Sequence, residues 1–137
     1  MKFLIVEDDP DCQKLLQVYV STYAELHTAD NGREAVRAYT DSLDAGEPFK
    51  LICMDIMMPG MDGHEALAAI RRLETDRGLA RHQWVKVIMT TALKDSDHAK
   101  KAFFNESCEA YLVKPIKKQA LVKWLEQLGV AFAHTDL

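Results

Sequence analysis

Short apolar runs alternate along the chain with longer segments whose apolar residues recur every three or four positions. A continuous apolar run is typical of a strand buried on both faces, and the longer period is typical of an amphipathic helix. The expected strands are residues 2–6, 25–29, 51–55, 84–89 and 110–113. Because a helix is expected after each strand, the pattern predicts a doubly wound α/β fold with a five-stranded, mostly parallel sheet, (βα)5.

The expected helices are defined by their beginnings and by their apolar faces. Asp9 is expected to cap the first helix, with Pro10 in its first position. Arg71, Arg72 and Glu74 are assigned to a solvated face of the third helix. The residues expected to face inward, helix by helix, are Cys12, Leu15, Leu16, Tyr19 and Tyr23; Val36, Tyr39 and Leu43; Leu67, Ile70 and Leu73; Ala99, Ala102, Phe103 and Phe104; and Leu121, Trp124, Leu125 and Leu128.

Polar residues follow four of the five predicted strands. They are Glu7 and Asp8 after the first strand, Asp55 after the third, Thr91 after the fourth and Lys114 after the fifth. Right-handed crossovers place the carboxyl ends of parallel strands at one edge of the sheet, where open α/β folds bind their ligands. Each residue alone has an ordinary structural explanation, but their shared position predicts a functional site.

The chemistry of that site follows from its charges. Clustered carboxylates repel one another, and a bound cation relieves the repulsion. Oxygen ligands without His or Cys at metal spacing favour a hard cation, Mg²⁺. Asp55 would then accept a phosphoryl group, while Mg²⁺, Lys114 and the Thr91 hydroxyl neutralise its oxygens. The sequence therefore predicts a switch that promotes its own phosphorylation.

Composition narrows the class of protein further. The chain has 137 residues, 48% of them hydrophobic, and a net charge of -4, which disfavours broad nucleic-acid or anionic-membrane binding. Cys12, Cys53 and Cys108 contain no C-x-x-C pair and are expected to be buried free thiols in a reducing cytosol. With no signal peptide or membrane-spanning run, the expected location is cytoplasmic. The expected organisation is one domain, residues 1–129, followed by a short tail, residues 130–137.

Taken together, these motifs resemble a response-regulator receiver domain of two-component signalling, of the single-domain chemotaxis type. The resemblance covers essentially the whole chain and implies the strand order 2-1-3-4-5. It also implies a cis peptide bond between Lys114 and Pro115. The residues that carry it are the acid pair Glu7-Asp8, Asp55 in Asp-Ile-Met-Met-Pro-Gly-Met-Asp-Gly, Thr91-Ala92, Tyr111 and Lys114-Pro115.

The resemblance implies particular roles at the acidic site. A sensor histidine kinase or phosphotransfer protein would donate the phosphoryl group to Asp55. Asp8, Asp55 and the backbone carbonyl of Met57 would hold Mg²⁺ directly, and Glu7 would act through water. In this scheme the protein is not an enzyme with a separate substrate but a phosphoacceptor that promotes its own phosphorylation and dephosphorylation.

The resemblance also implies a two-state output. Thr91 would move toward the phosphoryl group and Tyr111 would change rotamer, although Tyr111 as a plain core aromatic is the alternative. The face formed by the fourth helix, fifth strand and fifth helix would then control a downstream target protein. Residues 94–123 contain seven Lys and four acids. This excess of positive charge would attract an acidic partner, unless the lysines only increase solubility.

Two apolar positions bear on how long the signal lasts. Met57 and Leu93 lie two residues beyond Asp55 and Thr91, where polar side chains can orient an attacking water. Because neither side chain here can do so, we expect slow self-dephosphorylation.

Three other classes of protein were weighed. A haloacid-dehalogenase-type phosphatase requires a second Asp at position 57, where Met57 stands. A flavodoxin-like cofactor binder requires a Gly/Ser/Thr phosphate loop after the first strand, where the acids 7–9 would repel the phosphate. A receiver-like protein-binding module that acts without phosphorylation is the strongest alternative, although such modules usually lack one of the site residues.

Overall fold

The computed structural model describes residues 1–92 and 108–131. The expected fourth helix, with Leu93 before it, lies outside these residues. The observed elements, in chain order, are β1 (Lys2–Val6), α1 (Pro10–Val20), β2 (Glu25–Ala29), α2 (Gly32–Asp44), β3 (Leu51–Asp55), α3 (Gly63–Asp76), the 3-10 helix η1 (Arg81–Gln83), β4 (Lys86–Thr91), β5 (Ala110–Val113) and α5 (Lys118–Gln127).

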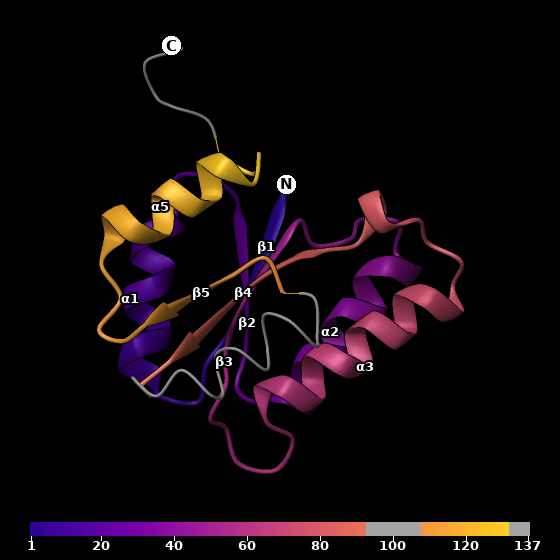
Figure 1. Cartoon of the computed structure of the whole chain (residues 1–137), viewed down its shortest axis with the longest axis horizontal. Helices are drawn as coiled ribbons and strands as arrows, with labels where there is room; N and C mark the ends of the chain where they lie inside the picture. The colour runs from indigo at the N-terminus through magenta and orange to yellow at the C-terminus, as the bar shows by residue number, and fades with distance from the viewer. Residues whose placement is uncertain (93–107, 132–137) are drawn as a thin grey trace.

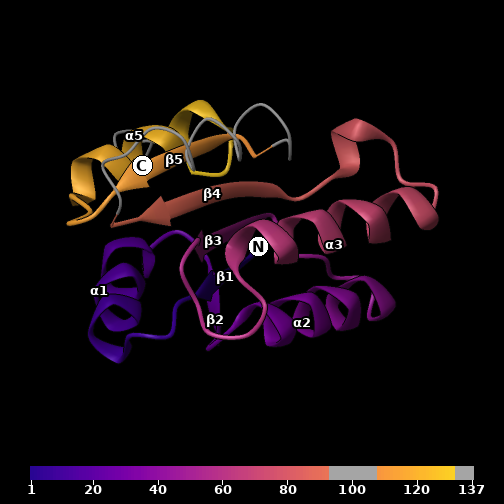
Figure 2. The same ribbon diagram turned by 60° about the horizontal axis from the view of Figure 1, so that its bottom comes forward.

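The five strands form one parallel sheet in the order β2-β1-β3-β4-β5 (Figure 1). Helices α1 and α5 pack together on one face of the sheet, and α2 and α3 pack together on the other (Figure 2). This arrangement confirms the doubly wound α/β fold and the expected strand order. It also places the carboxyl ends of β1, β3, β4 and β5 along one edge.

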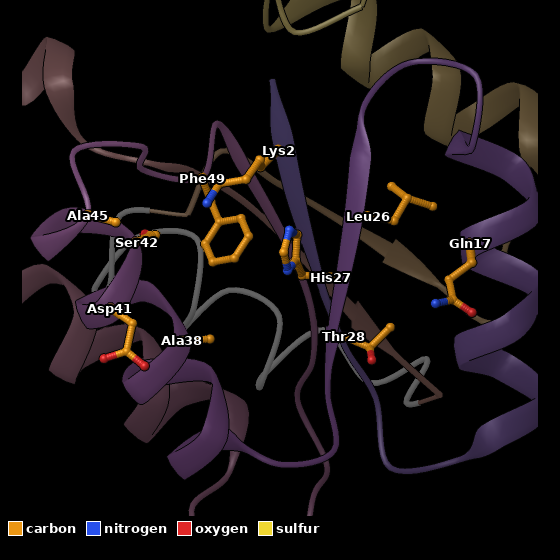
Figure 3. Close-up of a pocket in the computed structure, with 10 residues that line it drawn as sticks. All are labelled: Lys2, Gln17, Leu26, His27, Thr28, Ala38, Asp41, Ser42, Ala45 and Phe49. Atoms are coloured by element: carbon orange, nitrogen blue, oxygen red, sulfur yellow. The ribbon is translucent and has the colours of Figure 1, made fainter.

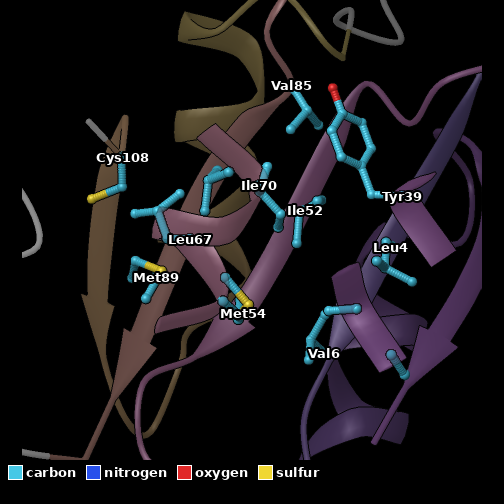
Figure 4. Close-up of a cluster of buried hydrophobic side chains, with 14 of the residues drawn as sticks. Leu4, Val6, Tyr39, Ile52, Met54, Leu67, Ile70, Val85, Met89 and Cys108 are labelled. Atoms are coloured by element: carbon cyan, nitrogen blue, oxygen red, sulfur yellow. The ribbon is translucent and has the colours of Figure 1, made fainter. Parts of the chain in front are cut away.

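The central strand β3 is apolar from Leu51 to Met54 because it lies between two hydrophobic cores. All five of its residues are buried, and successive side chains point to opposite faces of the sheet. Ile52 and Met54 join the hydrophobic cluster beneath α2 and α3, which is shown in Figure 4. Leu51 and Cys53 join the second cluster, beneath α1 and α5. A strand between two cores has no face on which a polar residue could remain hydrated.

The predicted start of α1 is confirmed, and α3 also begins at a side-chain cap. The Asp9 carboxylate accepts a hydrogen bond from the Asp11 N–H at 3.0 Å, and Pro10 is the first residue of α1. Asp62 and Glu65 form a reciprocal capping box at the start of α3. Each cap satisfies backbone N–H groups that the first helical turn leaves without an intrahelical partner.

The assignment of Arg71 and Glu74 to a solvated face is wrong. Both side chains are buried, whereas Arg72 is exposed as predicted. Glu74 accepts hydrogen bonds from the Tyr39 hydroxyl at 2.8 Å and from the Val85 N–H at 2.7 Å. It also accepts one from Arg71 at 2.8 Å. These contacts replace the hydration that both charged groups lose on burial.

The expected inward face of α1 is partly wrong. Leu15 is 43% exposed, while Leu16 and Val20 fill the buried stripe of this helix. The helix ends at Val20, so Tyr23 lies in the turn that follows. The sheet covers a stripe only one or two residues wide at each turn, so an apolar residue beside that stripe stays in water.

Three smaller expectations also change. The fourth strand runs from Lys86 to Thr91 rather than over residues 84–89. The polar sequence of residues 75–83 predicts a link before the fourth strand, but this segment contains the last residues of α3 and the 3-10 helix η1. All three cysteines are free, and Cys12 is only half-buried whereas Cys53 and Cys108 are buried.

Among the helices of the described ranges, none combines the length and the apolar character that crossing a bilayer requires.

Candidate functional site

Three carboxylates meet where β1 and β3 end. One oxygen from each of Glu7, Asp8 and Asp55 lies within 4.8 Å of the other two. Glu7 and Asp55 are buried, at 1% and 4% exposure, whereas Asp8 is exposed and opens the cluster to solvent. The cluster forms because β1 and β3 are neighbours in the sheet and their polar residues follow directly at the carboxyl ends.

In the part of the chain that the structure describes, one ammonium group, that of Lys114, enters this cluster from the end of β5. Lys114 Nζ lies 2.5 Å from Glu7 Oε1 and 3.3 Å from Asp55 Oδ2. Burial alone would lower the pKa of Lys114, but the hydrogen bond with Glu7 and the charges of Asp55 and Glu7 outweigh it, and the pKa is raised. Lys114 therefore stays protonated and bridges two buried carboxylates. The peptide bond between Lys114 and Pro115 is cis, as the resemblance implies.

One ammonium does not balance three carboxylates. Burial raises the pKa of Glu7, and the neighbouring carboxyl of Asp55 raises it further, against the opposing effect of Lys114. Burial and the carboxyl of Glu7 likewise raise the pKa of Asp8. Burial is the largest cause of both shifts, and the neighbouring carboxylates add to it. Three carboxylates beside the Lys114 ammonium leave negative charge in excess. A hard cation would relieve it, and the oxygen-only donors fit Mg²⁺.

The loop from β3 to α3 is shaped by glycines. A Cβ atom on Gly63 would lie 2.5 Å from the Asp55 carbonyl oxygen, so only glycine lets α3 begin this close to the end of β3. Gly60 adopts a φ of 76°, in the left-handed region that glycine favours. Within this loop Met58 is buried and the Met57 side chain is 55% exposed. The role of the Met57 carbonyl as a metal ligand stays a prediction.

The two residues assigned to switching lie on one face of the sheet. Tyr111 pairs with Met89 in the register of β5 and β4, and Thr91 lies two residues beyond Met89. Thr91 is 1% exposed, and its carbonyl accepts a hydrogen bond from the Lys114 N–H at 2.7 Å. Tyr111 is half-buried against the cluster beneath α2 and α3. The structure thus places Thr91 and Tyr111 near each other and ties Thr91 to Lys114.

One polar residue beside this site could not be identified from the sequence. Gln13, in the first turns of α1, donates hydrogen bonds to the Glu7 carbonyl at 3.0 Å and to the Asp30 carboxylate at 3.1 Å. A glutamine near the start of a helix belongs to no distinctive sequence pattern. Its contacts with two loops can therefore be recognised only in the structure.

A groove of about 640 Å³ lies elsewhere, across the edge strand β2 (Figure 3). His27 and Phe49 form an edge-on ring pair in its wall, with centroids 5.4 Å apart, and Lys2 lies over the Phe49 ring. None of the residues that line the groove belongs to the carboxylate cluster. The groove is therefore separate from the chemistry at the ends of β1 and β3.

The fold agrees with comparison to known proteins. Residues 3–126 match the response regulator receiver domain family, and the chain belongs to that family of two-component signalling proteins. The chain is 32% identical over 128 residues to the sensor histidine kinase GacS of Pseudomonas protegens. That match covers 90% of this chain and 13% of the kinase. Another relative, the regulatory protein VanRB of Enterococcus faecalis, is covered over 52% of its length.

Solved structures show the same fold. The receiver domain of Ssk1 from Saccharomyces cerevisiae, crystallised with the histidine phosphotransfer protein Ypd1, has a TM-score of 0.81 and 29% identity. That match covers 94% of this chain and 88% of the other. TrrA of Thermotoga maritima, solved with Mg²⁺ and beryllium fluoride, has a TM-score of 0.72 and 26% identity, covering 93% and 97% of the two chains.

Proposed function

We propose that the protein accepts a phosphoryl group on Asp55 from a phosphohistidine of a sensor kinase or phosphotransfer protein. Its phosphorylation state would control a partner protein. The observation that carries this proposal is the placement of the Asp55 carboxylate between the Lys114 ammonium and two further carboxylates. Two comparisons support this kind of donor. One relative is a sensor histidine kinase, and a similar receiver domain was crystallised with a histidine phosphotransfer protein.

In this proposal the transfer forms an O–P bond at Asp55 and breaks the N–P bond of the donor histidine. Glu7, Asp8 and Asp55 would hold Mg²⁺, which supplies positive charge to the transferring group. The Lys114 ammonium, already 3.3 Å from Asp55 Oδ2, supplies a second positive charge from a fixed position. A preorganised charge of this kind needs little rearrangement as the reaction proceeds.

The output would pass through β4 and β5. The Thr91 hydroxyl would donate a hydrogen bond to the phosphoryl group, and Tyr111, on the same face of the sheet, would respond. The affected surface would comprise β5, α5 and the segment 94–107 that precedes β5, which lies outside the described residues. We propose a cytoplasmic switch that modifies only itself, rather than an enzyme with a separate substrate.

A docking face for the phosphodonor is also available. Among the residues that the structure describes, few large apolar side chains are exposed, and two of them, Leu15 at 43% and Val18 at 63%, lie on α1. This helix begins directly after the acid pair Glu7-Asp8. Because the donor histidine must reach Asp55, an apolar face beside the site suits a transient partner.

The proposal is tested by intact mass after incubation with acetyl phosphate, with and without Mg²⁺. Wild type should gain about 80 Da, one phosphoryl group, only when Mg²⁺ is present. Asp55→Asn should show no gain. Asp41→Asn, a matched change at an exposed position on α2, should behave as wild type.

The same experiment separates the main alternative. A wild-type protein that gains no mass under these conditions would act as a binding module independent of phosphorylation. A gain that persists in Asp55→Asn would place the acceptor on another residue. Either result would reject the proposed acceptor.

A further inference from the structure

The side-chain amide of Gln13 holds two loops together at the edge of the site. Its nitrogen donates to the Glu7 carbonyl at 3.0 Å and to the Asp30 carboxylate at 3.1 Å. It also lies 3.4 Å from the Ala29 carbonyl. All three neighbours are acceptors, so the NH₂ group of Gln13, and not its carbonyl, must face them. One residue of α1 therefore joins the loop after β1 to the loop after β2.

The contact to Glu7 fixes a particular peptide group. The Glu7 carbonyl belongs to the peptide bond that joins Glu7 to Asp8. The N–H of the same peptide donates to the Glu7 carboxylate, Oε2, at 3.1 Å. Both polar ends of this peptide are therefore held, the oxygen by Gln13 and the nitrogen by Glu7. A peptide plane held at both ends sets the direction in which the Asp8 side chain leaves the backbone.

We infer that Gln13 is a positioning residue for the cation site, acting through the peptide between Glu7 and Asp8. This inference rests on the proposed function, because it assumes that the carboxylates hold Mg²⁺. Asp8 is the exposed member of the cluster, whereas Glu7 and Asp55 are buried. Without the amide of Gln13, its carboxylate would sample orientations that do not converge on Glu7 and Asp55. Partners that orient metal ligands in this way contribute substantially to metal affinity.

A purely structural role is the competing explanation. In that explanation Gln13 only ties the two loops through Asp30, and Asp30 would matter as much as Gln13. Asp30→Ala removes that tie but leaves the hydrogen bond to Glu7. Gln13→Met keeps the length of the side chain and removes every donor. Gln17→Met makes the same change one turn further along α1 and serves as the matched control.

The experiment is a calorimetric titration of Mg²⁺ into the metal-free wild type and these three variants. We expect Gln13→Met to weaken Mg²⁺ binding about tenfold, as loss of an orienting partner typically does. Gln17→Met and Asp30→Ala should bind as wild type does. Unchanged binding by Gln13→Met would overturn the inference. Equal losses in Gln13→Met and Asp30→Ala would also overturn it, in favour of a loop tie.

A measurement on wild type covers the case in which Gln13→Met does not fold. In a ¹⁵N spectrum, the side-chain amide signals of Gln13 should shift on Mg²⁺ addition, and those of Gln17 should not. Static Gln13 signals during Mg²⁺ binding would reject the inference. If wild type binds no Mg²⁺, the proposed function fails together with the inference. If wild type binds Mg²⁺ and the variants bind it equally well, only the inference fails.

Discussion

At the scale of single residues, Met57 stands out beside the proposed phosphoacceptor. Its side chain is 55% exposed, although methionine usually lies inside a protein, and the next residue, Met58, is 7% exposed. A thioether neither donates a hydrogen bond nor accepts a strong one. A water approaching Asp55 from this side would find no group on Met57 to orient it for attack on an aspartyl phosphate.

Met57→Asn should therefore shorten the lifetime of the phosphorylated protein. An amide at this exposed position would orient the attacking water, and we expect loss of phosphate to accelerate about tenfold, below the range of full general base catalysis. The measurement is the decay of the phosphorylated mass after removal of acetyl phosphate. Met57→Leu, which stays apolar, should decay as wild type does. Equal decay of all three proteins would show that Met57 does not limit hydrolysis.

Single residues also show which parts of the site could be predicted from sequence. Glu7, Asp55 and Lys114 follow apolar strands directly, so strand position alone brings them together. Gln13 could not be found in this way, because its contacts depend on how far α1 lies from two separate loops. Position along a strand is encoded locally, whereas the reach of a side chain across loops is not.

At the scale of elements, the strands were predicted better than the helix faces. Four of the five strands begin and end as expected. The clearest signals come from β1 and β3, whose runs of buried apolar residues lie between the two cores. A helix buries only one stripe of its surface, and the elements packed against the helix determine which residues lie in that stripe. Arg71 and Glu74 were predicted to be exposed, but both are buried. They bond to each other and to the backbone of Val85, just before β4.

The pair formed by Arg71 and Glu74 anchors the end of α3 to the strands β4 and β5. Arg71 donates to the Val85 carbonyl at 2.9 Å, just before β4. It also lies 3.4 Å from the carboxylate of Glu109, just before β5. Glu109 in turn accepts a hydrogen bond from the Val87 N–H at 2.6 Å. The buried charges therefore link one helix to two strands at the amino edge of the sheet, opposite the carboxylate cluster.

Arg71→Met should destabilise the fold strongly. It would leave Glu74, which is 0% exposed, without its positive partner, and removing one member of a buried pair costs about 3–5 kcal/mol. Arg72→Met, the same change on the exposed neighbour, should alter the free energy of unfolding by less than about 0.5 kcal/mol. Urea unfolding measures both. Similar decreases in the free energy of unfolding for the two variants would mean that the buried ion pair contributes little to stability.

At the scale of the whole molecule, the fold concentrates unbalanced charge at one edge and builds its cores on both faces. Three carboxylates share one ammonium at the carboxyl edge of the sheet. Their repulsion opposes folding of the metal-free protein, since the unfolded chain separates the charges. A cation that binds only the folded protein should therefore stabilise the entire domain, and unfolding becomes a global measure of the site.

Mg²⁺ should raise the unfolding temperature of wild type, and the increase should grow with the logarithm of the Mg²⁺ concentration above its Kd. At a concentration 100 times its Kd, the gain in the free energy of unfolding is about 2.7 kcal/mol. Asp55→Asn removes one of three ligands and one of three repelling charges, so it should be more stable than wild type without metal and gain little when metal is added. A control with NaCl at the same ionic strength measures how much of the stabilisation comes from charge screening and not from Mg²⁺ binding. If Asp55→Asn gains as much as wild type, Mg²⁺ binds elsewhere, and the cluster owes its arrangement to Lys114 alone.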